Sequence, residues 1–293
     1  MNQRKPEWLK VPNARNQIHD QVFSLIRHLS LHTVCEEANC PNRGECYSNG
    51  TATFLLMGDR CTRQCKFCNV TKLTPMKLDP DEPKHIAEAV KTLKLQYVVL
   101  TSVTRDDLMD GGASVFAESL REIRQLMPNL PIEVLIPDLQ GDINALKTIL
   151  DANPTVLNHN IETVPSLYEE VRPIANYQRS LSVLEKTKQL RPDILTKSGM
   201  MLGLGETKEE ILSVLRDLRQ IGCNLMVIGQ YLPPSQHHRP LSRYVTPEEF
   251  EFYLQKGLEY GFNGVISSPL ARSSYHAMKM IHQNIRRHDE SKD

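Results

Sequence analysis

Six short apolar runs, each followed by an amphipathic stretch, constrain the fold of this chain more than any other feature of its sequence. Each run is rich in Leu or β-branched residues and is bounded by polar or turn residues, which is typical of buried parallel strands. The runs span residues 52–58, 97–103, 132–138, 155–162, 194–203 and 224–232. Such an alternation predicts parallel strands joined by right-handed helical crossovers.

The segments between the strands carry helical patterns. A helix is expected from Pro83, a residue suited to the first turn, and another between a Thr207 cap with Glu210 three positions later and a closing Gly222. Further helices are expected over residues 16–29, 114–127, 143–152 and 180–190.

The fold class that this order predicts is α/β, a partial (β/α)6 TIM-like barrel with N-terminal and C-terminal extensions. We expect an N-terminal extension over 1–50, a barrel core over 51–235 and a C-terminal extension over 236–293. A doubly wound open sheet has the same local pattern, so periodicity alone does not separate the two folds.

Polar, punctuated segments follow the predicted strands, where parallel α/β folds gather their chemistry. The first of them, residues 59–70, contains Cys61, Cys65 and Cys68. Thiolates suit iron–sulfur clusters, and a [4Fe–4S] cluster usually takes four, so three would leave one iron open. A zinc loop with a fourth ligand from elsewhere is the alternative.

A second set of three thiols, Cys35, Cys40 and Cys46, precedes the first. Taken alone it could be a zinc loop, but its place before the other set favours the ligands of a second iron–sulfur cluster. The seventh cysteine, Cys223, stands alone at a helix–strand junction and is expected to be a buried apolar residue.

Charge and hydropathy exclude several classes of protein. The chain has 35 basic and 35 acidic residues, which gives no electrostatic reason to bind nucleic acid or a membrane surface. No apolar run approaches the ~18 residues of a membrane span, and the polar start lacks the core of a signal peptide. We therefore expect the protein in the cytoplasm. In such a reducing compartment, clustered thiols indicate metal ligands or redox groups rather than structural disulfides.

The spacing Cys-x3-Cys-x-aromatic-Cys, with Phe67 as the aromatic residue, resembles the signature of the radical S-adenosylmethionine (SAM) superfamily. This resemblance implies that the open iron binds the cofactor's amino and carboxylate groups and that the cofactor is cleaved to methionine and a 5′-deoxyadenosyl radical. The two cysteine sets, together with "VTRDDLMDGGA", "LNHNIETVP", "KSGMMLGLGE" and "ARSSYHA", resemble the lipoyl synthase family over nearly the whole chain.

The family resemblance implies a sulfurtransferase. Two sulfur atoms would be inserted at the sixth and eighth carbons of an octanoyl chain carried on a lysine, with one SAM used for each. These C–H bonds have no acidity for a base to exploit, so a radical cofactor would carry the hard step. Two [4Fe–4S] clusters are implied, of which the second supplies the sulfur and is consumed.

The resemblance also gives the C-terminal "ARSSY" a role. Ser274 resembles the fourth ligand of the sacrificial cluster, and Arg272 would lie over that cluster. A serine oxygen is a poorer iron ligand than a thiolate, which suits a cluster that is dismantled. Without the family, this stretch would be interpreted as an ordinary polar loop.

Cofactor contacts are expected at several further residues, each with a structural alternative. Adjacent glycines allow close approach to a ligand or simply form a turn. Asn160 and Glu162 would lie on one side of a strand, where they would bind the cofactor or form a hydrogen-bonded strand end. Arg172 would pair with the cofactor carboxylate or form an interdomain salt bridge. The expected set is Phe67, Gly111, Gly112, Asn160, Glu162, Arg172, Lys197 and Met201. Core packing is the alternative for Met201 and Leu202, and His237 and His238 are expected in a loop at the site's rim.

Implied partners are octanoylated lipoyl carrier domains, namely 2-oxoacid dehydrogenase E2 and the glycine cleavage H protein. A reductant such as ferredoxin or flavodoxin is also implied, and the chain is expected to be a monomer. Rival hypotheses are a methylthiotransferase, which would carry an RNA-binding domain, and a biotin synthase-like enzyme, which would lack the set of Cys35, Cys40 and Cys46. A non-catalytic module with two zinc sites is the rival from another class.

Overall fold

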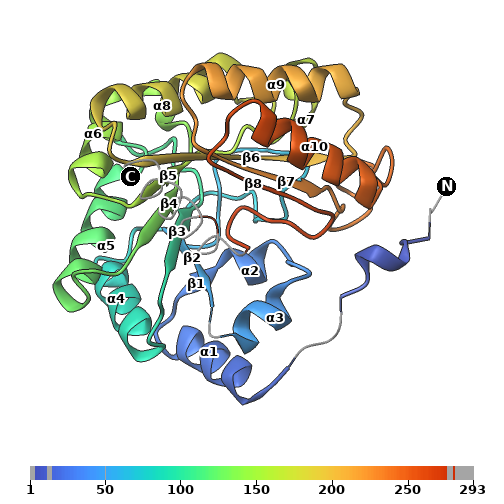
Figure 1. The fold of residues 1–293 in the computed structure, drawn as a ribbon. Helices are drawn as coiled ribbons and strands as arrows, with labels where there is room; N and C mark the ends of the chain where they lie inside the picture. Colours follow the sequence, from blue (N-terminus) through green and yellow to red (C-terminus); the bar gives the residue numbers. More distant parts are fainter. Residues whose placement is uncertain (1–3, 12–14, 50, 276–279, 281–293) are drawn as a thin grey trace, which may run out of the picture.

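The computed structural model describes residues 4–11, 15–49, 51–275 and 280, and its strands form one sheet (Figure 1). The strands follow one another in the sheet in sequence order. They are β1 (His32–Thr33), β2 (Thr53–Leu56), β3 (Val98–Ser102), β4 (Ile132–Leu135), β5 (Val156–Asn158), β6 (Leu195–Leu202), β7 (Leu225–Gln230) and β8 (Gly264–Ser267).

The order and direction of the strands identify a barrel. Strands β2 to β8 are all parallel to their neighbours, and only β1 is antiparallel to β2. A doubly wound sheet would reverse its strand order at a switch point, and this sheet does not. Within the described residues β8 pairs only with β7, so the barrel is open. The predicted partial TIM-like barrel is confirmed, as are all six predicted strands.

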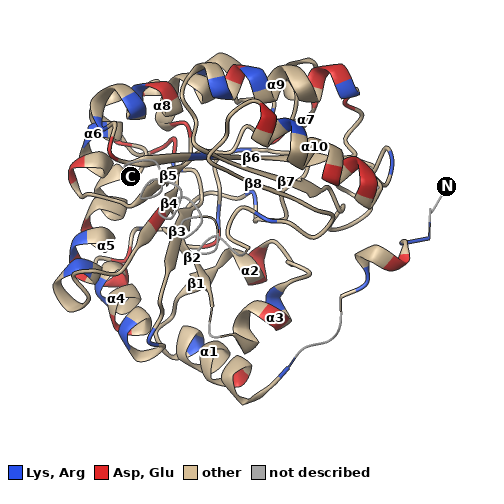
Figure 2. Cartoon of the chain, viewed as in Figure 1, with Lys and Arg blue, Asp and Glu red and all other residues tan. Residues whose placement is uncertain are grey.

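The outer layer consists of helices that surround the sheet (Figure 1). They are α4 (Glu82–Thr92), α5 (Ala113–Leu126), α6 (Ile143–Asp151), α7 (Tyr168–Val171), α8 (Tyr177–Leu190), α9 (Lys208–Gln220) and α10 (Pro247–Glu259). Their apolar faces bury the main core against the outward-facing strand residues, such as Val98, Leu100 and Ile132. Figure 2 shows acidic and basic residues interspersed over the outer helices. None of the described helices has the length and hydropathy that a membrane span needs.

Capping chemistry explains where the helices begin. Thr207 and Glu210 form the predicted capping box of α9, and Gly222 follows its end with φ of +82°. The same box, Thr246 with Glu249, starts α10, which the sequence reasoning missed together with β1 and β8. Strand β8 lies in the segment expected as a C-terminal extension, so the sheet continues past residue 235.

The N-terminal part packs beside the first strands. It contains α1 (Gln17–His28), α2 (Val34–Glu37) and α3 (Arg43–Ser48), with β1 paired to β2. The expected helix over 16–29 is confirmed as α1, whose cap is the side chain of Asn16. Three short 3-10 helices, Glu7–Leu9, Leu139–Gly141 and Pro165–Leu167, complete the described elements.

The inner face of the barrel receives the C-terminal segment. Ala271 and Met280 pack in one cluster with Leu225 and Val227 of β7. A Cβ atom on Gly229 would lie 2.2 Å from the Ala271 carbonyl oxygen, so only glycine admits the segment there. Residues far beyond the last strand thus return to the middle of the barrel.

Candidate active site

The loop that contains Cys61, Cys65 and Cys68 leaves β2 through two residues of positive φ, Met57 at +68° and Gly58 at +86°. The buried Glu82 carboxylate at the start of α4 accepts the Met57 N–H at 2.9 and 3.0 Å and fixes this exit. Further on, the Cys61 amide donates to the Thr71 carbonyl at 2.9 Å, which closes the loop on itself. The loop is therefore a compact unit at the carboxyl end of the strand.

Backbone donors point at the first sulfur of the loop. The Cys61 Sγ atom accepts the amide of Arg63 at 3.4 Å and that of Thr104, after β3, at 3.3 Å. Donors aimed at a sulfur stabilise negative charge on it, which is the state that binds metal.

Burial and mutual repulsion keep the other two thiols of the loop protonated. Burial raises the pKa of Cys68 to about 12, with Cys65, Cys61 and Glu162 adding to the rise. Burial also raises the pKa of Cys65, which Arg172 opposes. Cys61 contributes to the raised pKa of both Cys65 and Cys68, and a bound cationic cluster would offset that penalty.

Arg63 ties the loop to the neighbouring strand ends. Its guanidinium makes two bonds to Asp106, after β3, and donates to Asp138, after β4, at 2.9 Å. Burial would raise the pKa of Asp138, but Arg63 more than offsets it and holds that pKa below its usual value. Sequence reasoning missed these three residues, and their one signal was charge within segments that follow strands.

The loop after β7 holds the cysteine loop from the other side. A ring nitrogen of His238 bonds the Cys68 carbonyl at 3.2 Å, and the Arg239 amide donates to the Lys66 carbonyl at 2.9 Å. His237 is exposed, while His238 joins Ser235 to the cysteine loop. Both histidines therefore lie in a loop, as expected, and His238 adds a contact that its sequence did not reveal; the place of this loop at the rim of the substrate site stays a prediction.

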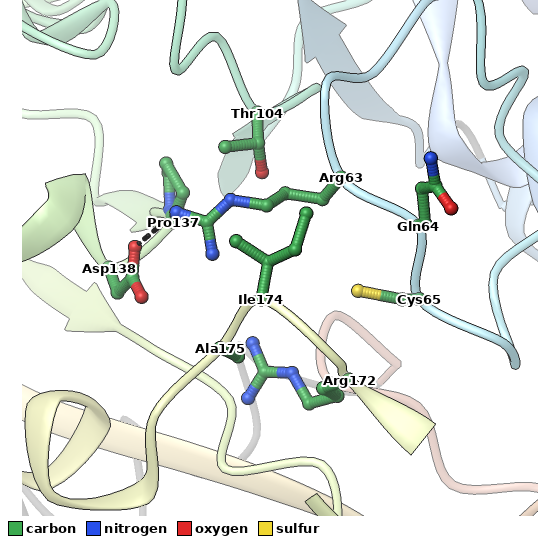
Figure 3. A pocket seen from close by; sticks show the side chains of 9 residues that line it. All are labelled: Arg63, Gln64, Cys65, Thr104, Pro137, Asp138, Arg172, Ile174 and Ala175. Atoms are coloured by element: carbon green, nitrogen blue, oxygen red, sulfur yellow. Dashed lines mark hydrogen bonds and ion pairs between the residues drawn. The ribbon is translucent and has the colours of Figure 1, made fainter. Parts of the chain in front are cut away.

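The side chains around Cys65 form a cleft (Figure 3). Arg63, Cys65, Arg172 and Ile174 converge there from the cysteine loop and from the segment after β5. Its complete lining is Arg63, Gln64, Cys65, Thr104, Pro137, Asp138, Arg172, Ile174 and Ala175. The Arg172 guanidinium, which lies in this cleft together with the Cys65 thiol, is suited to an anionic group of a ligand.

Asn160, Glu162 and Arg172 lie together, as the motif spacing suggested, but beyond the end of β5 rather than within it. The Asn160 amide donates to Glu162 at 3.1 Å, and Arg172 donates to the carbonyls of Asn160 and Ile161 at 3.1 and 3.2 Å. Burial raises the pKa of Glu162, and Arg172 opposes the rise. Because the buried Arg172 Nε has no partner among the described residues, it is available to a ligand.

The glycine pair before α5 has a packing reason of its own. Gly111 and Gly112 have φ of +61° and +88°, and a Cβ on Gly112 would lie 2.3 Å from the Met57 sulfur. Asp110 accepts the amides of Gly112 and Ser114 at 2.9 and 2.8 Å. The turn interpretation accounts for both glycines, and their contact with the cofactor remains a prediction.

A small apolar cluster joins the cysteine loop to β6. Phe67 and Met201 both pack against the cluster of Val171, Leu204 and Tyr231. Leu202, by contrast, is fully buried in the main core on the other face of β6, as its alternative had it. Phe67 and Met201 are thus brought together at one side of the cysteine loop.

The set of Cys35, Cys40 and Cys46 lies on and between the short helices before β2. Cys35 is in α2, Cys46 is in α3, and the Cys40 amide between them donates to the Cys35 carbonyl at 3.1 Å. Burial raises the pKa of Cys35 to about 11 and that of Cys46 to about 12, and the neighbouring thiols add to both shifts.

The C-terminal segment meets this set of thiols. The Asn42 side chain donates to the Leu270 carbonyl at 2.8 Å, and the Tyr275 hydroxyl donates to Glu45 at 3.0 and 3.1 Å. Burial lowers the pKa of Arg272, and the nearby Cys40 opposes that shift. Ser274 therefore lies in a stretch whose residues on both sides contact the cysteine segment.

Lys197 lies away from the cleft around Cys65. Its amine, 1% exposed, pairs with Glu133 and donates to the Ser273 carbonyl. Its contact with the cofactor remains a prediction. Cys223 is fully buried, as expected.

No three His, Cys, Asp or Glu side chains in the described ranges meet closely enough to hold a single metal ion. That finding concerns one shared ion. In a [4Fe–4S] cluster each thiolate binds a different iron, so the ligands stand further apart. Three thiols that interact electrostatically, with backbone donors at Cys61 and Arg172 beside Cys65, fit such a cluster.

Comparison with known proteins gives the chain its relatives. Residues 55–218 match the family model described as "Radical SAM superfamily". A lipoyl synthase from Caldanaerobacter subterraneus subsp. tengcongensis is 53% identical over 277 residues, which cover 94% of this chain and 97% of the relative. One from Alkaliphilus metalliredigens is 49% identical, with 99% and 98% covered.

Solved structures agree in fold. HydG, a maturase of the [FeFe]-hydrogenase, has a TM-score of 0.60 at 14% identity and covers 93% of this chain and 60% of its own. Methylornithine synthase (PylB) has a TM-score of 0.52 at 16% identity, with 86% of each chain covered. These likenesses show the fold alone.

Proposed function

The chain belongs to the lipoyl synthase family of the radical SAM superfamily, and from that premise we propose that its two cysteine sets hold two [4Fe–4S] clusters with different tasks. The enzyme is a sulfurtransferase that inserts sulfur at the sixth and eighth carbons of a protein-bound octanoyl-lysine. Its substrates are octanoylated lipoyl carrier proteins.

Cys61, Cys65 and Cys68 are the proposed ligands of the cluster that reacts with SAM. When bound, that cluster supplies the electron that cleaves the cofactor. The residues of the chain bind and orient: Arg172 offers its free Nε to the cofactor carboxylate, and Asn160 and Glu162 offer hydrogen-bonding groups at the same strand end. Phe67 and Met201 supply apolar contact beside the adenine, and Gly111 and Gly112 permit close approach.

Cys35, Cys40 and Cys46, with Ser274, are the proposed ligands of the sacrificial cluster. The observation that carries this proposal is the meeting of the C-terminal "ARSSY" with the N-terminal thiols, through Arg272 beside Cys40 and Tyr275 on Glu45. A hydroxyl oxygen completes the set with a weaker ligand than a fourth thiolate would be.

The finer assignments of partner and place are proposed from the family resemblance. The carriers are the E2 subunits of 2-oxoacid dehydrogenases and the glycine cleavage H protein, and the electron donor is a ferredoxin or flavodoxin. The proposed enzyme is a monomer of the cytoplasm, a compartment that keeps seven free cysteines reduced.

Iron, sulfide and product analysis after anaerobic reconstitution tests the proposal. With reductant, SAM and an octanoyl-lysyl peptide, we expect about eight irons per chain, 5′-deoxyadenosine and lipoyl product. Bound zinc without deoxyadenosine would leave a binding module. Deoxyadenosine without lipoyl product would instead favour a biotin synthase-like or methylthiotransferase activity on another substrate.

A further inference from the structure

We propose that the buried pair of Glu133 and Lys197 positions Ser274 by holding the peptide unit that precedes it. The inference rests on the proposed role of Ser274 as a ligand of the sacrificial cluster. It assigns a task to two charged residues that no step of the sulfur insertion uses.

The pair has no evident role in stability. Both side chains are 1% exposed, and the Lys197 amine lies 3.0 and 3.1 Å from the two carboxylate oxygens of Glu133. A buried ion pair is often no more stabilising than apolar residues of the same size, because both charges lose their hydration. A specific third partner is a better reason for the pair.

That third partner is the backbone of the C-terminal segment. The Lys197 amine donates to the Ser273 carbonyl oxygen at 2.5 Å. An ammonium group has three donors, and here the amine bonds both oxygens of Glu133 and the carbonyl of Ser273. The Ser273 carbonyl belongs to the planar peptide unit that ends at the Cα of Ser274, so fixing its oxygen fixes the start of Ser274.

Glu133 is itself held rigidly. The Tyr97 hydroxyl donates to one carboxylate oxygen at 2.6 Å, and the Asn158 amide donates to the other at 2.8 Å. Burial, together with Glu133, raises the pKa of Tyr97 well above its usual value, which keeps the hydroxyl a donor. The four side chains come from β4, β5, β6 and the residue before β3, and thus from the rigid inner wall of the barrel.

Ser273 is held on its other side as well. Its hydroxyl donates to the Asn160 side chain at 3.0 Å, and a Cβ on Gly199 would lie 3.0 Å from that hydroxyl and 2.8 Å from the Asn160 oxygen. Asn160 in turn donates to Glu162, beside the other cysteine loop. The barrel wall therefore fixes both the carbonyl and the hydroxyl of the residue before the proposed ligand.

The test uses a chain that loads only the sacrificial cluster, with Cys61, Cys65 and Cys68 all changed to Ala. In this background, Glu133→Leu with Lys197→Met removes both charges together and spares the fold the cost of one unpaired buried charge. We expect release of iron to a chelator to become roughly 10- to 100-fold faster, the usual cost of losing a residue that orients a metal ligand. The electron paramagnetic resonance spectrum of the reduced cluster should shift toward that of Ser274→Ala.

Two comparisons separate positioning from general weakening. Ser274→Ala added to the paired variant should accelerate release no further, since both changes act through the same ligand. Lys197→Arg, which keeps a cationic donor, should restore most of the slow release. Tyr177→Phe, which loses a hydrogen bond to Asp217 at 2.7 Å between α8 and α9, is the matched control and should leave the spectrum unchanged.

Each result decides a different point. Unchanged release and an unchanged spectrum in the paired variant, with circular dichroism of a folded chain, would overturn the positioning role. If the variant with the apolar pair does not fold, Glu133→Gln with Lys197→Gln replaces it, and the same measurements of iron release and spectrum apply. Weakened SAM binding by the paired variant in a Cys35, Cys40 and Cys46 to Ala background would return Lys197 to the cofactor. A parent chain that binds no iron at Cys35, Cys40 and Cys46 would reject the proposed second cluster itself.

Discussion

At the residue scale, His159 shows how the interior sets a protonation state. It is 1% exposed, and its Nδ1 bonds the Ile136 carbonyl at 2.9 Å. Burial, followed by the charge of Arg172, lowers the pKa of His159 to about 4. The ring is therefore neutral at neutral pH, with Nδ1 as the donor to the Ile136 carbonyl.

This state predicts a pH dependence of stability. Below its ordinary pKa of 6.5, His159 takes up a proton in the unfolded chain but not in the folded one, so stability is lost as pH falls from 6.5 toward 4. By pH 5.5 the loss from this one group is about 1 kcal/mol. Anaerobic urea unfolding at pH 7.5 and 5.5 should show it, and His159→Gln should remove that part of the difference. An identical pH dependence in both proteins would contradict the prediction.

Residues whose role depends on distant partners were the ones that the sequence could not reveal. The cysteines are recognised in the sequence by their spacing. The position of Asn160 and Glu162 at a strand end follows from the alternation of strands and helices. Nothing local, however, links Lys197 to a glutamate 64 positions earlier or to a serine 76 positions later. For that reason the sequence suggested only the cofactor as a partner for Lys197 and did not reveal its contacts with Glu133 and the Ser273 carbonyl.

At the element scale, the predictable parts are those with a strong period or a cap. The six Leu-rich and β-branched runs gave strands, and the box of Thr207 and Glu210 gave the start of α9. The two-residue β1 is too short to show a period, and in the four-residue β8 only the first and last residues are buried, so no alternation is visible. Such short edge elements depend on the sheet beside them, so pattern alone does not find them.

Strand β7 carries a prediction about close packing. A methyl group on Gly229 would meet the Ala271 backbone oxygen at 2.2 Å, and backbone cannot yield as a side chain does. Gly229→Ala should displace the segment that holds Arg272 and Ser274, destabilise the chain by about 1–3 kcal/mol, and release most of the sacrificial iron. Iron analysis and thermal unfolding measure both effects.

Gly257→Ala in α10 is the control for that strand. A methyl group there would meet a side-chain atom of Val265 at 2.9 Å, and the side chain can move. We expect some loss of stability and full iron content. Full iron in Gly229→Ala as well would show that the segment accommodates the methyl group without moving the ligand.

At the scale of the whole molecule, the two cysteine sets have different structural origins. Cys61, Cys65 and Cys68 lie within residues 55–218, the part that matches the radical SAM family. The proposed ligands of the other cluster would come from both ends of the chain, from Cys35 on α2 and Ser274 beyond β8, and the Asn42 side chain bonds the Leu270 carbonyl between these two segments. In this proposal the segments on either side of the radical SAM part would supply a second site.

This division predicts separable losses. Cys61→Ala, Cys65→Ala or Cys68→Ala should abolish formation of 5′-deoxyadenosine, because the ligand set that would hold the reacting cofactor is incomplete. Cys35→Ala, Cys40→Ala or Cys46→Ala should leave cleavage measurable and stop lipoyl formation, because only the sulfur source is lost. Iron content should fall by about half in either group. Complete loss of cleavage in the second group, with folding and the remaining iron intact, would mean that the two sites act as one unit and that the extensions serve the radical step too.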